Sequence, residues 1–252
     1  MKQLNTYIIE KLKINKDSSK YNYHPQDKKE LHSLIEKLID ERGENADLND
    51  IDVSKITDMS WLFSYGASGK PCKFNCDISS WDVSNVTNMQ SMFCNSLFNG
   101  DISSWDVSNV INMGQMFCNS NFNQDISSWN VSNVTVMTNM FRNSDFNQDI
   151  SSWDVSNVKY MDAMFRESEF NKDISKWDVS NVEDMREMFL HTDFNQDISS
   201  WNVSNVKYMI DMFRDSAFNQ DISSWDVSSV INMKSMFFKS PLQKNPPVWF
   251  KK

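Results

Sequence analysis

Residues 77–100 read DISSWDVSNVTNMQSMFCNSLFNG, and close copies of this 24-residue unit follow without insertion or deletion. The tryptophan of the unit recurs at every twenty-fourth position, as Trp81, Trp105, Trp129, Trp153, Trp177, Trp201 and Trp225. A fixed period of this length is typical of repeat proteins, in which each unit packs on its neighbours. The sequence therefore predicts a continuous stack of seven units over residues 77–244, with unit positions numbered 1–24 from each Asp.

Apolar residues follow two different spacings within the unit. Trp81 and Val83 alternate with a polar residue, which is typical of a short strand. From Val86 the spacing becomes three, three and one, through Met89, Met92 and Phe93, which indicates one face of a helix. We therefore expect an α/β repeat solenoid, a right-handed leucine-rich-repeat-like stack of strand-plus-helix units. Positions 11, 12, 14, 15, 18 and 19 vary between units and are expected on the exposed face of the helix.

Stacked units place identical positions in columns. We expect the tryptophan, methionine and phenylalanine columns to form a continuous core, with methionine as core filler rather than as a ligand surface. Asn recurs at position 23, after a buried Phe, in Asn99, Asn123, Asn147, Asn171, Asn195 and Asn219. An amide at such a place predicts a hydrogen-bonded ladder from unit to unit.

The segments outside the seven units are expected to close the stack. Residues 47–76 resemble a degenerate first repeat, and 24–46 carry the apolar spacing of a capping helix, with Leu31, Ile35 and Leu38 on one face. Residues 245–252 are expected to cap the other end. Residues 1–14 predict an amphipathic leader and residues 15–23 a polar linker. The leader is either a frayed terminus or additional cap, or a docking tag for a larger assembly.

Charge and hydropathy exclude several partners. Residues 1–46 carry a net charge of +1 (nine Lys/Arg, eight Asp/Glu) and the remainder −10 (sixteen against twenty-six). An acidic stack repels phosphate backbones, so we expect no nucleic acid. Apolar runs are too short for a membrane span. A secretory signal and a lipobox cysteine are lacking, which favours the cytoplasm or a phage particle over secretion.

Few residues carry the pattern of a catalytic or metal site. The cysteines Cys72, Cys76, Cys94 and Cys118 have spacings that allow a zinc site, but Cys94 and Cys118 share one unit position, where later units carry Arg, Leu or Phe. The repeats contain a single histidine, His191, and no phosphate loop or catalytic triad. We expect no metal, no disulfide, no cofactor and no enzymatic activity.

The unit also resembles known repeats. Ile78-x-x-Trp81-x-Val83-x-x-Val86 has the spacing of the leucine-rich-repeat segment. Trp-Asp-Val-Ser-Asn-Val, followed by Met-x-x-Met-Phe and Phe-Asn-Gln-Asp-Ile, resembles the BspA-type bacterial surface-protein repeats over about residues 47–244. This resemblance implies a leucine-rich-repeat-like solenoid of a kind often found on surface proteins that adhere to other molecules.

Two surfaces are candidates for binding. Tyr and Arg most often anchor protein interfaces, and the variable helix face is expected to carry Arg142, Lys159, Tyr160, Arg166, Glu183, Arg186, Tyr208 and Arg214. On the strand side, position 6 forms a ladder that either holds cations or is solvated: Asp82, Asp106, Asp154, Asp178 and Asp226, with Asn130 and Asn202 interspersed.

The leading hypothesis is a non-enzymatic scaffold that binds a protein or glycan partner along the solenoid surface. The alternative is a structural component of a phage particle or larger assembly, tethered through residues 1–14, which resemble short leaders on proteins of large bacteriophages and gut bacteria.

Overall fold

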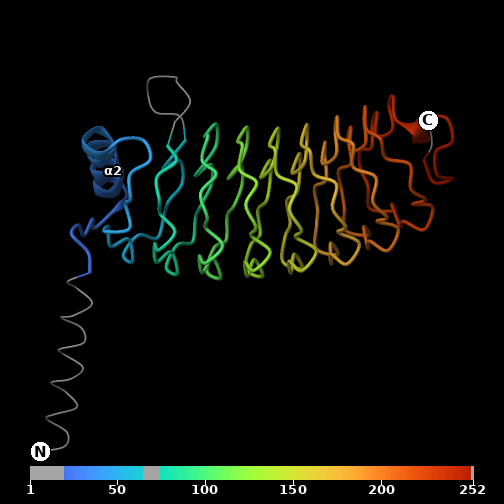
Figure 1. Ribbon diagram of the computed structural model, residues 1–252. Coiled ribbons are helices and arrows are strands. Elements are labelled where there is room, and N and C mark those ends of the chain that lie inside the picture. Colours follow the sequence, from blue (N-terminus) through green and yellow to red (C-terminus); the bar gives the residue numbers. More distant parts are fainter. Residues whose placement is uncertain (1–19, 65–73, 251–252) are drawn as a thin grey trace, which may run out of the picture.

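The computed structural model describes residues 20–64 and 74–250, and the units of the sequence form coils that lie side by side along one axis (Figure 1). We call them coils 1 to 7, in the order 77–100, 101–124, 125–148, 149–172, 173–196, 197–220 and 221–244. Regular helices among the described residues are α2, Lys28–Arg42, and the short 3-10 helix η1, Pro241–Gln243. The predicted leader 1–14 and most of the linker 15–23 lie outside the described residues.

The prediction that each unit consists of a strand followed by a helix is wrong. Between residues 77 and 240 the structure has no α-helix, and the Trp-x-Val segment of each coil is not a strand. From coil to coil the β-structure consists of isolated parallel bridges at position 12, between Asn88, Asn112, Val136, Tyr160, Asp184, Tyr208 and Asn232 in succession. Backbone pairing therefore occurs in the segment that the sequence predicts to be helical.

Each coil is built from tight turns instead. Backbone hydrogen bonds join residues three apart, as from Trp81 N to Ile78 O at 3.1 Å and from Met92 N to Met89 O at 3.2 Å. Such a turn brings residues i and i+3 close together, as one turn of a helix does. The spacing of Val86, Met89 and Met92 therefore imitates a helical face although no helix forms.

Two positions in each coil prevent the helix. Positions 15 and 19 have a left-handed backbone, with φ of 56° at Ser91 and 57° at Asn95 in coil 1, and no glycine occupies them. A left-handed residue ends a right-handed helix. The N–H groups at positions 13, 15, 17 and 19 then donate to the following coil, as from Ser91 N to Gly114 O at 2.8 Å and from Phe93 N to Met116 O at 2.9 Å. Over this segment the four bonds all run from one coil to the next one in the chain.

A substitution at Ala163 tests how much strain the left-handed backbone imposes. Its φ is 52° and its N–H donates to Arg186 O at 2.7 Å. Replacing it by glycine should stabilise the protein by about 0.5–1 kcal/mol, because relief of about 1–2 kcal/mol of strain exceeds the entropy cost of glycine. Ala217→Gly, at a site without positive φ, should destabilise. Urea unfolding of both variants measures this difference, and a loss of stability in Ala163→Gly contradicts the account.

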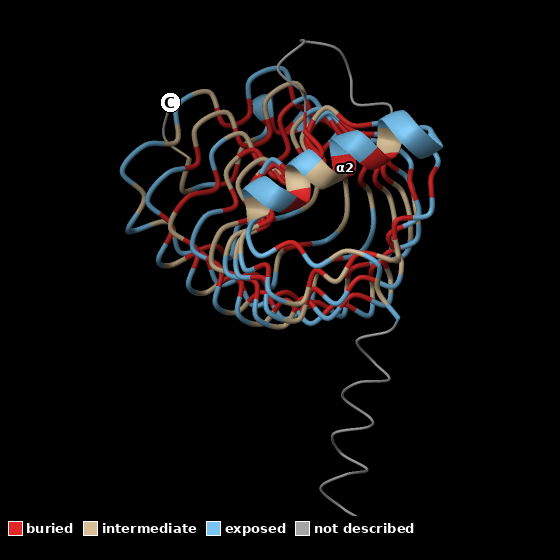
Figure 2. Cartoon of the chain, turned by 90° about the vertical axis from the view of Figure 1, so that its left-hand side faces the viewer, coloured by how far each residue is buried: buried red, intermediate tan, exposed pale blue. Residues whose placement is uncertain are grey.

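The interior is formed by the predicted columns. Phe165 is fully buried and lies 5.9 Å from Phe141 and 5.8 Å from Phe189, ring centre to ring centre, in the adjacent coils. Each buried tryptophan ring donates to a backbone carbonyl of the preceding coil, as from Trp153 Nε1 to Ile126 O at 3.1 Å. Figure 2, a view along the stack, shows buried residues along the inner side of the coils. The fit of aromatic columns requires each unit to keep the same length.

The asparagine ladder at position 23 is confirmed. The side-chain oxygen of each residue accepts from the backbone N–H of its equivalent in the next coil, as from Asn147 N to Asn123 Oδ1 at 2.9 Å. The same contact joins every pair from Asn75 to Asn219.

Helix α2 lies across the N-terminal end of the stack (Figure 2). Asp27 caps its first turn by accepting from Glu30 N at 2.9 Å, and Gly43, at φ 92°, follows its last residue. Leu31, Ile35 and Leu38 are buried, as the apolar spacing predicts. No helix among the described residues has the length and hydropathy that crossing a membrane requires. At the other end, Trp249 extends the tryptophan column, its ring nitrogen donating to Ile222 O at 3.0 Å.

Candidate functional site

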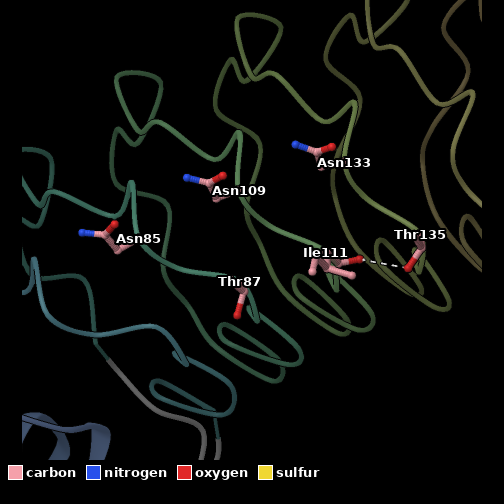
Figure 3. Close-up of a pocket in the computed structure, with 6 residues that line it drawn as sticks. All are labelled: Asn85, Thr87, Asn109, Ile111, Asn133 and Thr135. Carbon is pink, nitrogen blue, oxygen red and sulfur yellow. Dashed lines mark hydrogen bonds between the residues drawn. The ribbon is translucent and has the colours of Figure 1, made fainter.

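A shallow groove runs across coils 1 to 3 on one side of the stack. Its volume is about 520 Å³, and positions 9 and 11 line it: Asn85, Thr87, Asn109, Ile111, Asn133 and Thr135 (Figure 3). Ile111 stands out in this polar setting because its side chain is 49% exposed. The groove therefore combines an apolar contact with repeated amide and hydroxyl groups.

The asparagines of the groove are held by the stack. Asn109 Nδ2 donates to Ser84 O of the preceding coil at 2.7 Å, and Asn133 Nδ2 donates to Ser108 O at the same distance. Because the amide nitrogen is occupied, each side-chain oxygen is fixed in orientation. Within the described residues no donor reaches Asn109 Oδ1, so this oxygen remains an acceptor for a ligand hydroxyl or amide.

Position 11 continues from the groove into coils 4 to 6, where it becomes charged. Lys159, Glu183 and Lys207 alternate in sign along this column, and Lys207 Nζ forms an ion pair with Glu183. The hydrogen bond from Lys207, followed by its charge, lowers the pKa of the Glu183 carboxyl. This column is thus a border of mixed charge beside the aromatic residues at position 12.

Tyr160 and Tyr208 project from position 12, two coils apart, and their side chains are 42% and 37% exposed. Between them lies Asp184, which is 6% exposed and receives two charge-assisted bonds from Arg186, at 2.9 Å from Nε and 2.6 Å from Nη2. The Arg186 guanidinium also lies 5.5 Å from the centre of the Tyr208 ring. We call Lys159, Tyr160, Glu183, Asp184, Arg186, Lys207 and Tyr208 the tyrosine face.

The remaining predicted arginines occupy position 18, further along the same segment. Arg166 pairs with Glu187 of the next coil and with Glu167. Arg214 lies 3.3 Å from Asp211 and 5.2 Å from the centre of the Phe238 ring. Arg142 has no ion pair among the described residues, and its Nε is buried without a hydrogen-bond partner. Position 18 is therefore closer to the core than the tyrosine face.

The predicted helix face is thus a face of turns. The expected exposure of position 18 is wrong in three coils, because Cys94, Cys118 and Leu190 are 4–6% exposed. Most of the predicted charged residues, moreover, form ion pairs with residues that the prediction did not name. The aromatic side chains and the groove are therefore the parts of this surface that are available to a partner.

The aspartates of the proposed cation ladder accept hydrogen bonds within their own coil. Oδ1 of each accepts from the N–H of the serine two residues on, at 3.0–3.1 Å, in Asp82, Asp106, Asp154, Asp178 and Asp226. Bonds from the serine side chain and backbone lower the pKa of Asp106 and Asp178, and bonds from Ser228 lower that of Asp226. In residues 20–64 and 74–250, no group of three or more His, Cys, Asp or Glu side chains is arranged to hold a metal ion.

Sequence reasoning missed the groove. The side chains of Asn85, Asn109 and Asn133 bind the preceding coil, a contact that a single unit does not reveal. The available signal was Ile111, an apolar residue where neighbouring units carry Thr87 and Thr135.

A family model described as "Mycoplasma protein of unknown function, DUF285" matches residues 31–145, 95–193 and 143–249 in three overlapping segments. The overlap agrees with a tandem repeat. No curated protein matches the chain, and no solved structure matches it.

Proposed function

Since the chain belongs to the Mycoplasma family of unknown function DUF285, we propose that it is a non-enzymatic binding protein that holds a protein or glycan partner along one side of its stacked coils. The groove of coils 1 to 3 carries this proposal. Its oriented asparagine oxygens and exposed Ile111 offer hydrogen-bond acceptors beside an apolar surface, the combination that ligand sites commonly use.

The tyrosine face supports the same reading. Lys159 at position 11 lies in the column that lines the groove, so a partner extending from coil 3 into coil 4 meets Tyr160 next. Tyrosine supplies a large contact area at a small entropy cost. Arg186 is held in place by Asp184 before any partner arrives, which reduces the ordering cost of binding.

We also propose that the stack is a right-handed solenoid of the leucine-rich-repeat-like class, with turns in place of the expected strands and helices. The repeat's resemblance to BspA-type surface proteins, which often adhere to other molecules, supports the binding role. The identity of the partner follows from experiment rather than from the family description.

Alanine substitution of the two tyrosines tests this function. The full chain is titrated against a panel of purified polysaccharides and of candidate surface proteins, and against the same panel as Tyr160→Ala with Tyr208→Ala and as Ile111→Asp. We expect each variant to weaken binding about tenfold or more, as loss of an aromatic or apolar anchor does. Polysaccharide binding or protein binding then names the partner class.

Lys176→Ala is the matched control, because Lys176 is exposed at position 4, away from both the groove and the tyrosine face. It should bind as the unchanged protein does. Binding that survives all groove and tyrosine variants, or that Lys176→Ala abolishes, contradicts the proposal.

A further inference from the structure

Two cysteines face each other across adjacent coils. Cys94 in coil 1 and Cys118 in coil 2 both occupy position 18 and are each 4% exposed. The backbone bonds from Phe93 N to Met116 O at 2.9 Å and from Asn95 N to Cys118 O at 2.8 Å flank Cys94 on both sides. These bonds hold the two cysteines in register, and Cys94 Sγ accepts a hydrogen bond from Asn95 Nδ2 at 3.3 Å.

This register suits a disulfide. Paired segments of β-type lie about 4.8 Å apart, and bridged cysteines have Cα atoms about 4.4–6.8 Å apart. The two residues share a column, so their side chains leave the backbone in the same direction. A bridge therefore needs only a rotation of the side chains and a small approach of the two coils.

The surroundings make the two sulfurs unequal. The neighbouring Cys94 thiol and the positive charge of Arg142 lower the pKa of Cys118, against the opposing effects of burial and of Glu167. The neighbouring Cys118 and burial raise the pKa of Cys94. Arg142 is the next residue of the column, and its Nε lacks a hydrogen-bond partner among the described residues. Because Arg142 lies one coil from Cys118 and two coils from Cys94, its positive charge favours the Cys118 thiolate.

We propose that Cys94 and Cys118 form a reversible disulfide that joins coils 1 and 2, with a peroxide as the oxidant. The sequence analysis assigned these residues no role because later units carry Arg, Leu or Phe at the same position. The proposal is independent of the binding function above.

The chemistry balances in two steps. The Cys118 thiolate attacks one oxygen of hydrogen peroxide; an S–O bond forms, the O–O bond breaks, and hydroxide leaves. The Cys94 sulfur then attacks the Cys118 sulfur; the S–S bond forms, the S–O bond breaks, and the second oxygen leaves as water with the Cys94 proton. The two thiols lose two electrons, and the peroxide is reduced to two water molecules.

Peptide mapping tests the bridge. The folded full-length chain is treated with hydrogen peroxide, its remaining thiols are blocked with N-ethylmaleimide under denaturing conditions, and the digest is analysed by mass spectrometry. We expect a peptide that links Cys94 to Cys118, with the mass of two hydrogens lost, and its disappearance after reduction. The bridged form should also melt at a higher temperature than the reduced form.

Single variants assign the roles. Cys94→Ser should leave a Cys118 sulfenic acid that dimedone traps, whereas Cys118→Ser should leave Cys94 largely unreacted. Arg142→Ala should slow bridge formation several-fold, and Cys72→Ser with Cys76→Ser should not alter it. Thiols at 94 and 118 that both remain free, a bridge to another cysteine, or a link that forms only in the denatured chain each overturn the proposal.

Discussion

Deleting residues 149–172 should leave a folded protein one coil shorter, whereas deleting residues 149–160 should abolish cooperative folding. The first deletion removes one complete unit and joins Gln148 to Asp173, which recreates the junction between Gln148 and Asp149. Every column of stacked side chains is then continuous across the deletion. The free energy of unfolding of such a stack is approximately a sum of contributions from units and from interfaces. The shorter protein therefore loses the contribution of one unit and one interface.

The half-unit deletion has a different result because it removes Trp153, Val155 and Val158, all buried, while keeping Met161 and Phe165. The remaining half unit is too short to complete one coil of the stack. The tryptophans of the flanking coils also lose the tryptophan that packs between them. Thermal melts followed by near-ultraviolet circular dichroism distinguish the outcomes. Equal melting of both deletions contradicts the dependence on a fixed unit length.

Phe165→Ala should destabilise the protein by about 3–5 kcal/mol, the range for removal of a buried aromatic ring. Phe165 packs on rings in the preceding and following coils and on Phe170, whose ring centre is 4.1 Å away. The substitution leaves a cavity between coils that repeated turns hold rigidly in place. Urea denaturation gives the change in the free energy of unfolding.

Leu97→Ala is the control, since Leu97 is 49% exposed and should change stability by about 0.5 kcal/mol or less. Phe237→Ala should fall between the two, because Phe237 lies in the last coil and contacts a preceding ring, Phe213, together with the terminal Trp249 and Phe250. A Phe165→Ala variant as stable as Leu97→Ala contradicts the continuous core.

The inward residues could be predicted from the sequence, whereas the backbone conformation could not. Val86, Met89 and Met92 face the core in a helix or in successive turns, because both bring residues three apart to one side. The backbone is decided by the left-handed residues at positions 15 and 19, and those at position 15 are Ser91, Gln115, Asn139, Ala163, Glu187, Asp211 and Ser235. These lack the glycine that marks a left-handed backbone, and the hydrogen bonds that hold them there come from the neighbouring coil.

The candidate site could be predicted from the sequence to about the same extent as the fold. Variation between units identified Tyr160 and Tyr208 as exposed, because that inference needs only the inward columns. The groove beside Ile111 and the contact of Cys94 with Cys118 depend on how consecutive coils pair. A single unit carries no information on that pairing, so both features required the three-dimensional arrangement.

Over positions 13 to 19 the backbone hydrogen bonds between coils run in one direction, which gives the stack unlike ends. In coil 7 the backbone N–H groups of Met233, Ser235 and Phe237 find no acceptor within the described residues, while their equivalents in coil 6 all do. The fourth, at Lys239, donates to the side chain of Gln243 at 2.6 Å. The last coil therefore resembles the first turn of an α-helix, because its free N–H groups form a row that carries a partial positive charge. Gln243 acts there as a capping residue.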